Sequence, residues 1–148
     1  MESLKKISIA SDHAGYELKE KLRKYLESKD YCVIDFGTYS SQSVDYTDFA
    51  HILADSVEKG ESDLGITLCG SGNGISMTAN KHAGIRSAIC WNSEIARLAK
   101  SHNNANICAL PARFLSFEQA IDVIDVFLRT EFEGGRHERR IKKIPIKK

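Results

Sequence analysis

A glycine-rich segment, Cys69-Gly70-Ser71-Gly72-Asn73-Gly74, combines a nucleophilic thiol with three glycines at alternate positions. Such glycines allow a tight turn whose backbone N–H groups point into one concavity, and a helix behind the turn adds its positive end. A dinucleotide-binding loop is the commonest alternative. It fits poorly because the spacing is GxGxG, not GxGxxG, and no acidic residue ends the next strand, at Cys90-Trp91-Asn92. The segment therefore predicts a cradle for a phosphate or an oxyanion.

Cys69 opens this loop, where a helix terminus and several N–H dipoles favour the thiolate form. A thiolate there is a usable base near neutral pH, although position alone leaves a structural role open. The other cysteines, Cys32, Cys90 and Cys108, are interpreted as small core residues, because free cysteine is often buried. The sequence has no CxxC pair, so we expect reduced thiols rather than a disulfide framework.

Two arginines near the end of the chain, Arg136 and Arg140, are four residues apart. If the tail that starts at about residue 134 begins with a helix, they share one face and can grip a dianion together. The alternative is a solvated basic tail, because lysines continue the charge at positions 142, 143, 147 and 148.

β-rich runs alternate with amphipathic helical runs along the whole chain. Many of the β-rich runs are continuously apolar, which is typical of parallel strands covered on both faces. The alternation predicts an α/β fold, a doubly wound three-layer α/β/α sandwich with a five-stranded parallel sheet. Strands are predicted at 7–11, 31–36, 64–69, 86–90 and 107–110, and helices at 15–28, 47–59, 73–81, 93–102 (capped by Ser93) and 116–130 (capped by Ser116).

Polar groups stand at the ends of these elements. In a doubly wound sheet the ligand lies beyond the carboxyl ends of the strands. Asp12-His13 follows the first strand, the glycine loop follows the third and Arg113 follows the fifth, while His102-Asn103-Asn104 follows the fourth helix. We expect the fold to gather these groups.

Length and composition exclude several classes of protein. The chain has 148 residues, 42% hydrophobic and 28% charged, which fits one globular domain over 1–148. A net charge of +1 does not favour nucleic acid or an anionic membrane as partner. The sequence has no apolar run that could span a bilayer and no signal peptide, so the cytoplasm is the expected location. No set of His, Asp and Glu has convincing metal-ligand spacing.

Taken together, the motifs resemble the type B ribose-5-phosphate isomerases, a family that also contains galactose-6-phosphate and allose-6-phosphate isomerases. The resemblance covers nearly the whole chain and implies a Rossmann-like fold, no cofactor, and a homodimer or homotetramer with active sites shared between subunits. In this family the base is a cysteine that opens the glycine loop or a glutamate just after it. Ile75 takes the glutamate position here, which indicates the cysteine subtype. The motifs are Ser11-Asp12-His13-Ala14-Gly15, Asp45-Tyr46, Cys69 to Gly74, Ala79-Asn80-Lys81, His102-Asn103-Asn104 and Glu133-Gly134-Gly135-Arg136-His137.

The resemblance assigns a role to each candidate residue. His102 and Asp12 would open the furanose ring, and Cys69 would move a proton from C2 to C1 through an enediolate. The N–H groups of residues 70 to 74, with Ser71 and Asn103, would stabilise that anion. The expected catalytic residues are Cys69, Ser71, His102 and Asp12. The expected substrate-binding residues are Tyr46, Gly70, Gly72, Asn73, Gly74 and Asn103, with His13, Arg113, Arg136 and Arg140 on the phosphate.

Two other functions stay open. An isomerase of a 6-phosphate aldohexose, allose or galactose 6-phosphate, would use the same catalytic groups and differ only in room for one more carbon. A non-catalytic sugar-phosphate-binding module could keep the arginines, but it would have no need for Cys69, His102 and Asp12 together.

Overall fold

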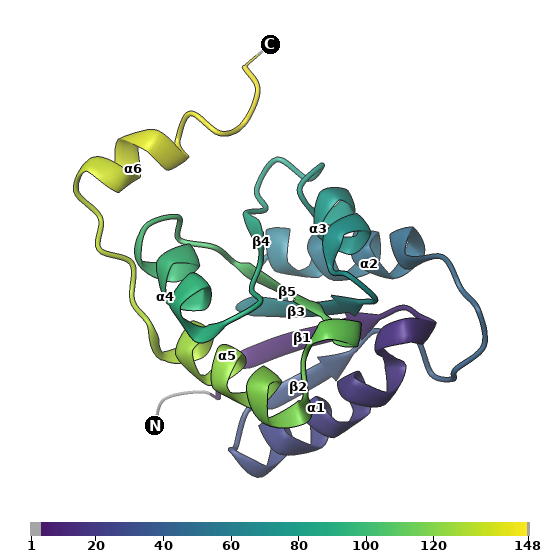
Figure 1. The fold of residues 1–148 in the computed structure, drawn as a ribbon. Helices are drawn as coiled ribbons and strands as arrows, with labels where there is room; N and C mark the ends of the chain where they lie inside the picture. Colours follow the sequence, from purple (N-terminus) through teal and green to yellow (C-terminus); the bar gives the residue numbers. More distant parts are fainter. Residues whose placement is uncertain (1–3, 148) are drawn as a thin grey trace.

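The computed structural model describes residues 4–147, and within them five strands form one parallel sheet (Figure 1). The predicted fold class is therefore confirmed. The predicted domain spans residues 1–148, of which residues 1–3 and 148 lie outside the described residues. Residues 1–3 also begin the segment in which the sequence predicts no signal peptide. In chain order the strands are β1 (Lys6–Ser11), β2 (Cys32–Asp35), β3 (Leu64–Cys69), β4 (Ser87–Ile89) and β5 (Ile107–Pro111), and their order in the sheet is β2-β1-β3-β5-β4.

The three central strands are buried almost throughout, which explains their continuous apolar sequences. Every residue of β3 and β5 is buried, and so is every residue of β1 after Lys6. The edge strands β2 and β4 are shorter and only partly buried. Strands covered on both faces gain nothing from polar alternation, so their sequences do not alternate.

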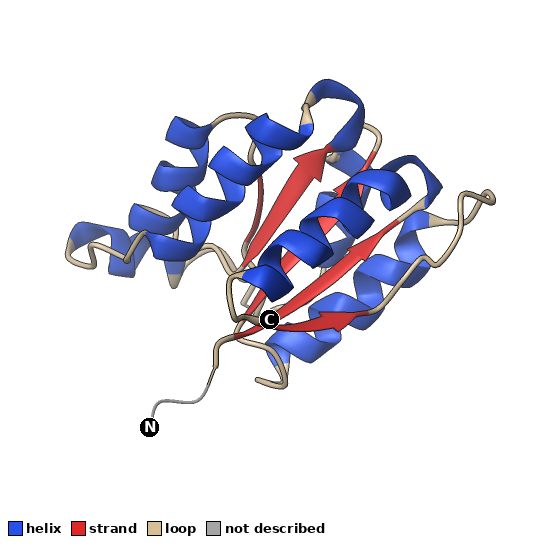
Figure 2. Cartoon of the chain, turned by 90° about the horizontal axis from the view of Figure 1, so that it is seen from below, coloured by secondary structure: helices blue, strands red, loops and turns tan. Residues whose placement is uncertain are grey.

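Helices cover both faces of the sheet (Figures 1 and 2). The apolar sides of α1, α4 and α5 pack in the larger core cluster on one face, and α2 and α3 pack on the other. No helix within residues 4–147 has the length and apolar character to cross a bilayer. The helices are α1 (Tyr16–Ser28), α2 (Tyr46–Glu58), α3 (Asn73–Ala79), α4 (Ser93–Ser101), α5 (Phe117–Arg129) and α6 (Arg136–Ile141), with short 3-10 turns at His13–Gly15 and Ala112–Phe114.

Helix caps agree with the sequence at α5 and differ at α4. Ser116 caps α5 in a full capping box with Gln119, as its position before the helix predicts. At α4 the prediction of Ser93 as cap is wrong. Asn92 is the cap, because its side chain accepts the N–H of Ile95 at 2.8 Å, and Ser93 is the first helical residue.

The tail begins with a helix, which is the condition for Arg136 and Arg140 to share a face. α6 starts at Arg136 and lies beyond the end of α4, away from the sheet (Figure 1). The segment before it is tied to α4 because the N–H of Glu133 donates to the carbonyl of Ser101 at 3.0 Å. On a helix, Arg136 and Arg140 share a face.

Candidate functional site

The carboxyl ends of β1 and β3 form the crevice of the sheet. After β1 the chain turns into α1 on one face, whereas after β3 it turns into α3 on the other. The two strands are neighbours, so the chain diverges between them, and such a switch point is where doubly wound folds bind ligands. Asp12 directly follows β1 and Cys69 ends β3. The N–H of Asp12 donates to the carbonyl of Leu68 at 3.2 Å, which holds the two loops together.

A cavity of about 470 Å³ opens at this crevice. It brings together predicted residues from four distant segments, with Asp12, Tyr46 and Arg113 each from one segment and the expected base with three further residues from the glycine loop. Phe114 also lines it and was missed, because its side chain carries no reactive group for a sequence argument to select. The lining residues are Asp12, Tyr46, Cys69, Gly70, Ser71, Gly74, Arg113 and Phe114.

Cys69 lines the cavity with a sulfur that receives a backbone hydrogen bond. The side chain is 5% exposed, and its Sγ accepts the N–H of Gly72 at 3.2 Å. Gly72 has φ +79°, a left-handed conformation that favours glycine and turns its N–H toward the sulfur. A donated hydrogen bond stabilises a thiolate relative to a thiol. Ile75 is fully buried beside Cys69, so the position of the family's glutamate belongs to the core here.

The N–H groups of the glycine loop divide into two sets. Those of Gly72 and Asn73 bond inside the loop, to Cys69 Sγ and to Ser71 Oγ at 3.2 Å. The N–H groups of Gly70, Ser71 and Gly74 have no hydrogen-bond acceptor within residues 4–147. An oxyanion hole built from this loop would therefore use the second set, which is narrower than the predicted run of residues 70 to 74.

Asp12 and His13 are fixed by backbone groups. Oδ1 of Asp12 accepts the N–H groups of Ala14 and Gly15 at 3.0 and 3.2 Å, and Oδ2 has no partner among residues 4–147. Nδ1 of His13 accepts the N–H of Val44 at 3.1 Å. An accepting Nδ1 leaves the proton of a neutral ring on Nε2, so His13 can donate to an anion.

Tyr46 and Arg113 both pack against glycines of the loop. A Cβ at Gly74 would lie 2.5 Å from Cζ of Tyr46, so only glycine allows the phenol ring this approach. The N–H of Arg113 donates to the carbonyl of Gly70 at 3.0 Å, and its guanidinium lies over the same residue. Both side chains are thereby held at the rim of the cavity that Cys69 lines.

The remaining predicted residues lie at the opposite end of the sheet, beyond the amino ends of the strands. His102, Asn103 and Arg140 line a separate cavity of about 360 Å³, with His137, Ile141 and Ile144. The expectation that one chain gathers all the candidates is therefore wrong. The physical reason is that α4 runs back against the strand direction, so its last residues reach the amino ends of the strands.

Strand register shows how far apart the two groups are. The carbonyl of Asn106, just after the His102-Asn103 loop, accepts from the N–H of Gly65 near the start of β3. Cys69 at the other end of β3 pairs with Pro111. Four residue steps of β5, from Ile107 to Pro111, span about 13 Å.

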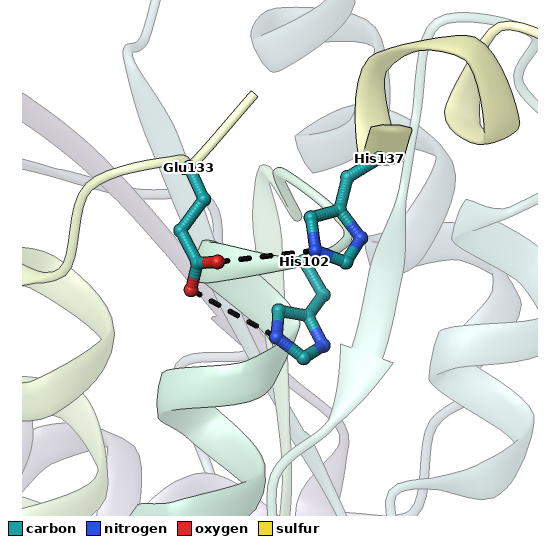
Figure 3. A group of neighbouring side chains, drawn as sticks. All are labelled: His102, Glu133 and His137. Atoms are coloured by element: carbon teal, nitrogen blue, oxygen red, sulfur yellow. Dashed lines mark ion pairs between the residues drawn. The ribbon is translucent and has the colours of Figure 1, made fainter. Parts of the chain in front are cut away.

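A compact group of side chains lies beside this second cavity. His102, Glu133 and His137 come from the end of α4, the α5–α6 connection and α6 (Figure 3). The two rings are stacked, with centroids 4.3 Å apart and planes inclined by 14°. Burial lowers the pKa of His137, and the neighbouring His102 and Arg136 lower it further, which favours the neutral ring. Glu133 follows His102 by 31 positions and His137 follows Glu133 by 4, and no rule for metal-ligand spacing in a sequence selects this combination.

Comparison with known proteins places this geometry in a family. The sequence model of the family Ribose/Galactose Isomerase matches residues 7–144. The chain belongs to this family. Among curated relatives in the family, it is 45% identical over 140 residues to the probable ribose-5-phosphate isomerase B of Mycoplasma genitalium, covering 93% of this chain and 92% of that protein. It is 41% identical over 141 residues to ribose-5-phosphate isomerase B of Escherichia coli, covering 95% of each.

Solved structures of family members share the fold closely. A ribose 5-phosphate isomerase from Thermotoga maritima superposes with a TM-score of 0.94 at 55% identity, covering 95% of this chain and 97% of that one. The M. genitalium ribose-5-phosphate isomerase B, solved with bound ribulose-5-phosphate, superposes with a TM-score of 0.90 at 45% identity, covering 94% and 93%. The predicted family resemblance is confirmed.

Proposed function

We propose that this chain is an aldose–ketose isomerase that interconverts ribose 5-phosphate and ribulose 5-phosphate, with Cys69 as the base. The observation that carries the proposal is the sulfur of Cys69 at a cavity, with the N–H of Gly72 donating to it at 3.2 Å. Relatives that share 41 to 45% of the sequence are ribose-5-phosphate isomerases by name. The family also includes galactose isomerases, so the pentose is the finer part of the proposal.

The catalytic steps use the groups around the cavity together with His102, which a second copy of the chain would supply. Asp12 and His102 transfer the protons that open the ring, from the O1 hydroxyl and to the ring oxygen. The thiolate of Cys69 then takes the proton from C2, the electron pair of that C–H bond forms the C1–C2 double bond, and the π pair of the C1 carbonyl moves to O1, which gives an enediolate. A proton moves from O2 to O1, and Cys69 returns its proton to C1. The N–H groups of Ser71 and Gly74 stabilise the anion, and each well-placed donor of this kind contributes about 3 kcal/mol.

The phosphate is assigned to the cationic groups. His13 offers Nε2–H and Arg113 its guanidinium from the edge that carries Cys69. Arg136 and Arg140 provide a second pair on α6. A phosphate fixed at the far end lets binding energy align the reacting carbons with the sulfur.

Two copies of the chain complete each site in this proposal. His102, Asn103 and Arg140 lie beyond the amino ends of the strands, and Cys69 ends β3 at the carboxyl end, where it pairs with Pro111 about 13 Å from the start of β5. In a two-fold dimer, the α4–α6 end of one copy can face the glycine loop of the other, which forms two equivalent sites. We therefore propose a homodimer or a tetramer built from such dimers, and the cytoplasm stays the predicted location.

The deciding experiment is incubation of the purified protein with ribose 5-phosphate and detection of the ketose product. Parallel reactions with allose 6-phosphate and galactose 6-phosphate compare kcat/KM for the three sugars. The proposal expects the highest kcat/KM for ribose 5-phosphate. A higher value for either hexose would replace the pentose by that sugar, and no turnover of any of the three would leave a binding module instead.

A further inference from the structure

We propose that His102, Glu133 and His137 form a binding site for a zinc-like divalent cation (Figure 3). Two imidazoles and one carboxylate are a donor set suited to zinc, with water completing the coordination. Cations such as Mg²⁺ that prefer oxygen ligands would not compete for it.

The spacing of the donor atoms fits an ion between them. Nε2 of His102 lies 3.8 Å from Oε2 of Glu133, and Nε2 of His137 lies 3.9 Å from Oε1 of the same carboxylate. All three donors lie within 4.8 Å of one another. These separations are too long for hydrogen bonds. Two ligands on a tetrahedral zinc, each at about 2.1 Å, are about 3.4 Å apart, so the two carboxylate–imidazole separations must shorten by about 0.5 Å and no donor separation by more than about 1.4 Å.

An independent observation points to a missing ligand at the same place. His137 is 7% exposed, and its Nε2 is buried without any hydrogen-bond partner in the described part of the chain. Buried polar atoms nearly always have a hydrogen-bond partner, so we expect this nitrogen to bind an acceptor or an ion. It is also the ring nitrogen that faces Glu133.

The backbone holds two of the three ligands in place. Glu133 is fixed by its N–H to the carbonyl of Ser101, next to His102, and the N–H of His137 donates to the carbonyl of Gly134 at 3.2 Å. The stacked rings do not yet aim their nitrogens at a common point, so one ring must turn. His102, whose side chain is 37% exposed, has the freedom to do so. Arg136 and Arg140 oppose a cation here, so we expect weaker binding than at closed structural zinc sites.

An occupied site would inhibit the enzyme, a consequence that rests on the proposed function. Zinc on His102 would occupy the ring nitrogen assigned to the proton transfer of ring opening. Inhibition by zinc, relieved by a chelator, is therefore expected in the isomerase assay.

Calorimetric titration of the full-length, chelator-treated protein with Zn²⁺ tests the site without any substrate. One zinc per chain is expected, and Glu133→Gln and His137→Gln should each weaken binding by about tenfold or more. Glu133 is 53% exposed, so its variant tests the site without disturbing packing. Two controls should keep normal affinity: His82→Gln, which breaks the other close histidine pair (Nε2 to Nδ1 of His51, 2.8 Å), and Cys69→Ala, which removes the cavity thiol.

Each outcome decides the proposal. Zinc binding that is absent, unchanged in both site variants, or lost in either control would overturn it. Because calorimetry needs no turnover, an inactive protein that still binds zinc at this cluster would refute the proposed function and leave the metal site standing. Zinc that binds at the cluster without slowing turnover would refute only its inhibitory role.

Discussion

Mixing two inactive variants should restore activity if two chains share each active site. Cys69→Ala removes the proposed base at the carboxyl ends of the strands. His102→Gln removes the proposed ring-opening group at their amino ends. The two positions lie at opposite ends of the strands of one chain, and β5 alone spans about 13 Å between those ends. In a mixed dimer, one site then receives both lesions and the other receives neither.

The size of the recovery follows from the two-fold arrangement. Random reassociation of equal amounts gives mixed dimers as half of the population, and each has one intact site out of two. The mixture should therefore recover about one quarter of the wild-type kcat. The assay is ketose formation from ribose 5-phosphate after the variants are dissociated, mixed and reassociated.

A second pair of variants serves as the negative control. Cys69 and Asp12 line the same cavity of one chain, so mixing Cys69→Ala with Asp12→Asn leaves no intact site and should restore nothing. If the Cys69 and His102 variants together give only the sum of their separate activities, each chain completes its own site and the shared-site account fails.

Two further variants test other parts of the structure. Replacing Arg136 and Arg140 together by Ala should chiefly raise KM and weaken inhibition by inorganic phosphate, whereas Arg139→Ala, on the same helix, should change neither. Equal phosphate inhibition in the wild-type protein and both variants would mean a merely solvated tail. Asp35→Asn should lower the free energy of unfolding in urea by about 2 kcal/mol, because the fully buried Lys19 amine lies 2.9 Å from both oxygens of Asp35 and would keep only the carboxylate of Glu20, at 2.8 Å. Lys19→Met should cost less, since the carboxylates it releases can reach water, and a larger loss than for Asp35→Asn would contradict this reasoning.

The fold could be predicted from the sequence because its signals are local. The predicted bounds of β1 and β3 agree with the structure to within one residue. Runs such as Ile66 to Cys69 lack polar alternation, which is typical of parallel strands that are buried on both faces. Near α4 the prediction failed by one position. Asn92 and Ser93 are both good caps, and only the backbone conformation selects between them.

Only part of the site could be predicted from the sequence. Topology rules place some of its residues, and the other contacts depend on a chain path that no sequence pattern specifies. Asp12 and Cys69 follow neighbouring strands, and the rule for switch points places them together. The position of His102 at the opposite edge also follows from topology, since a helix between parallel strands must end where the next strand starts. The contact of His102 with Glu133 and His137 depends on the path after α5, for which no periodic pattern exists.

The central claim is that the sulfur of Cys69 carries the proton between C1 and C2, and its most direct test is kcat for Cys69→Ala beside Cys32→Ala. The interpretation of Cys32 as a core residue is wrong, because it is an exposed thiol on the edge strand β2, and it therefore controls for general thiol effects. The account predicts that Cys69→Ala lowers kcat by about 100-fold or more while ribose 5-phosphate still binds, and that Cys32→Ala turns over normally. Near-normal turnover by Cys69→Ala would contradict it.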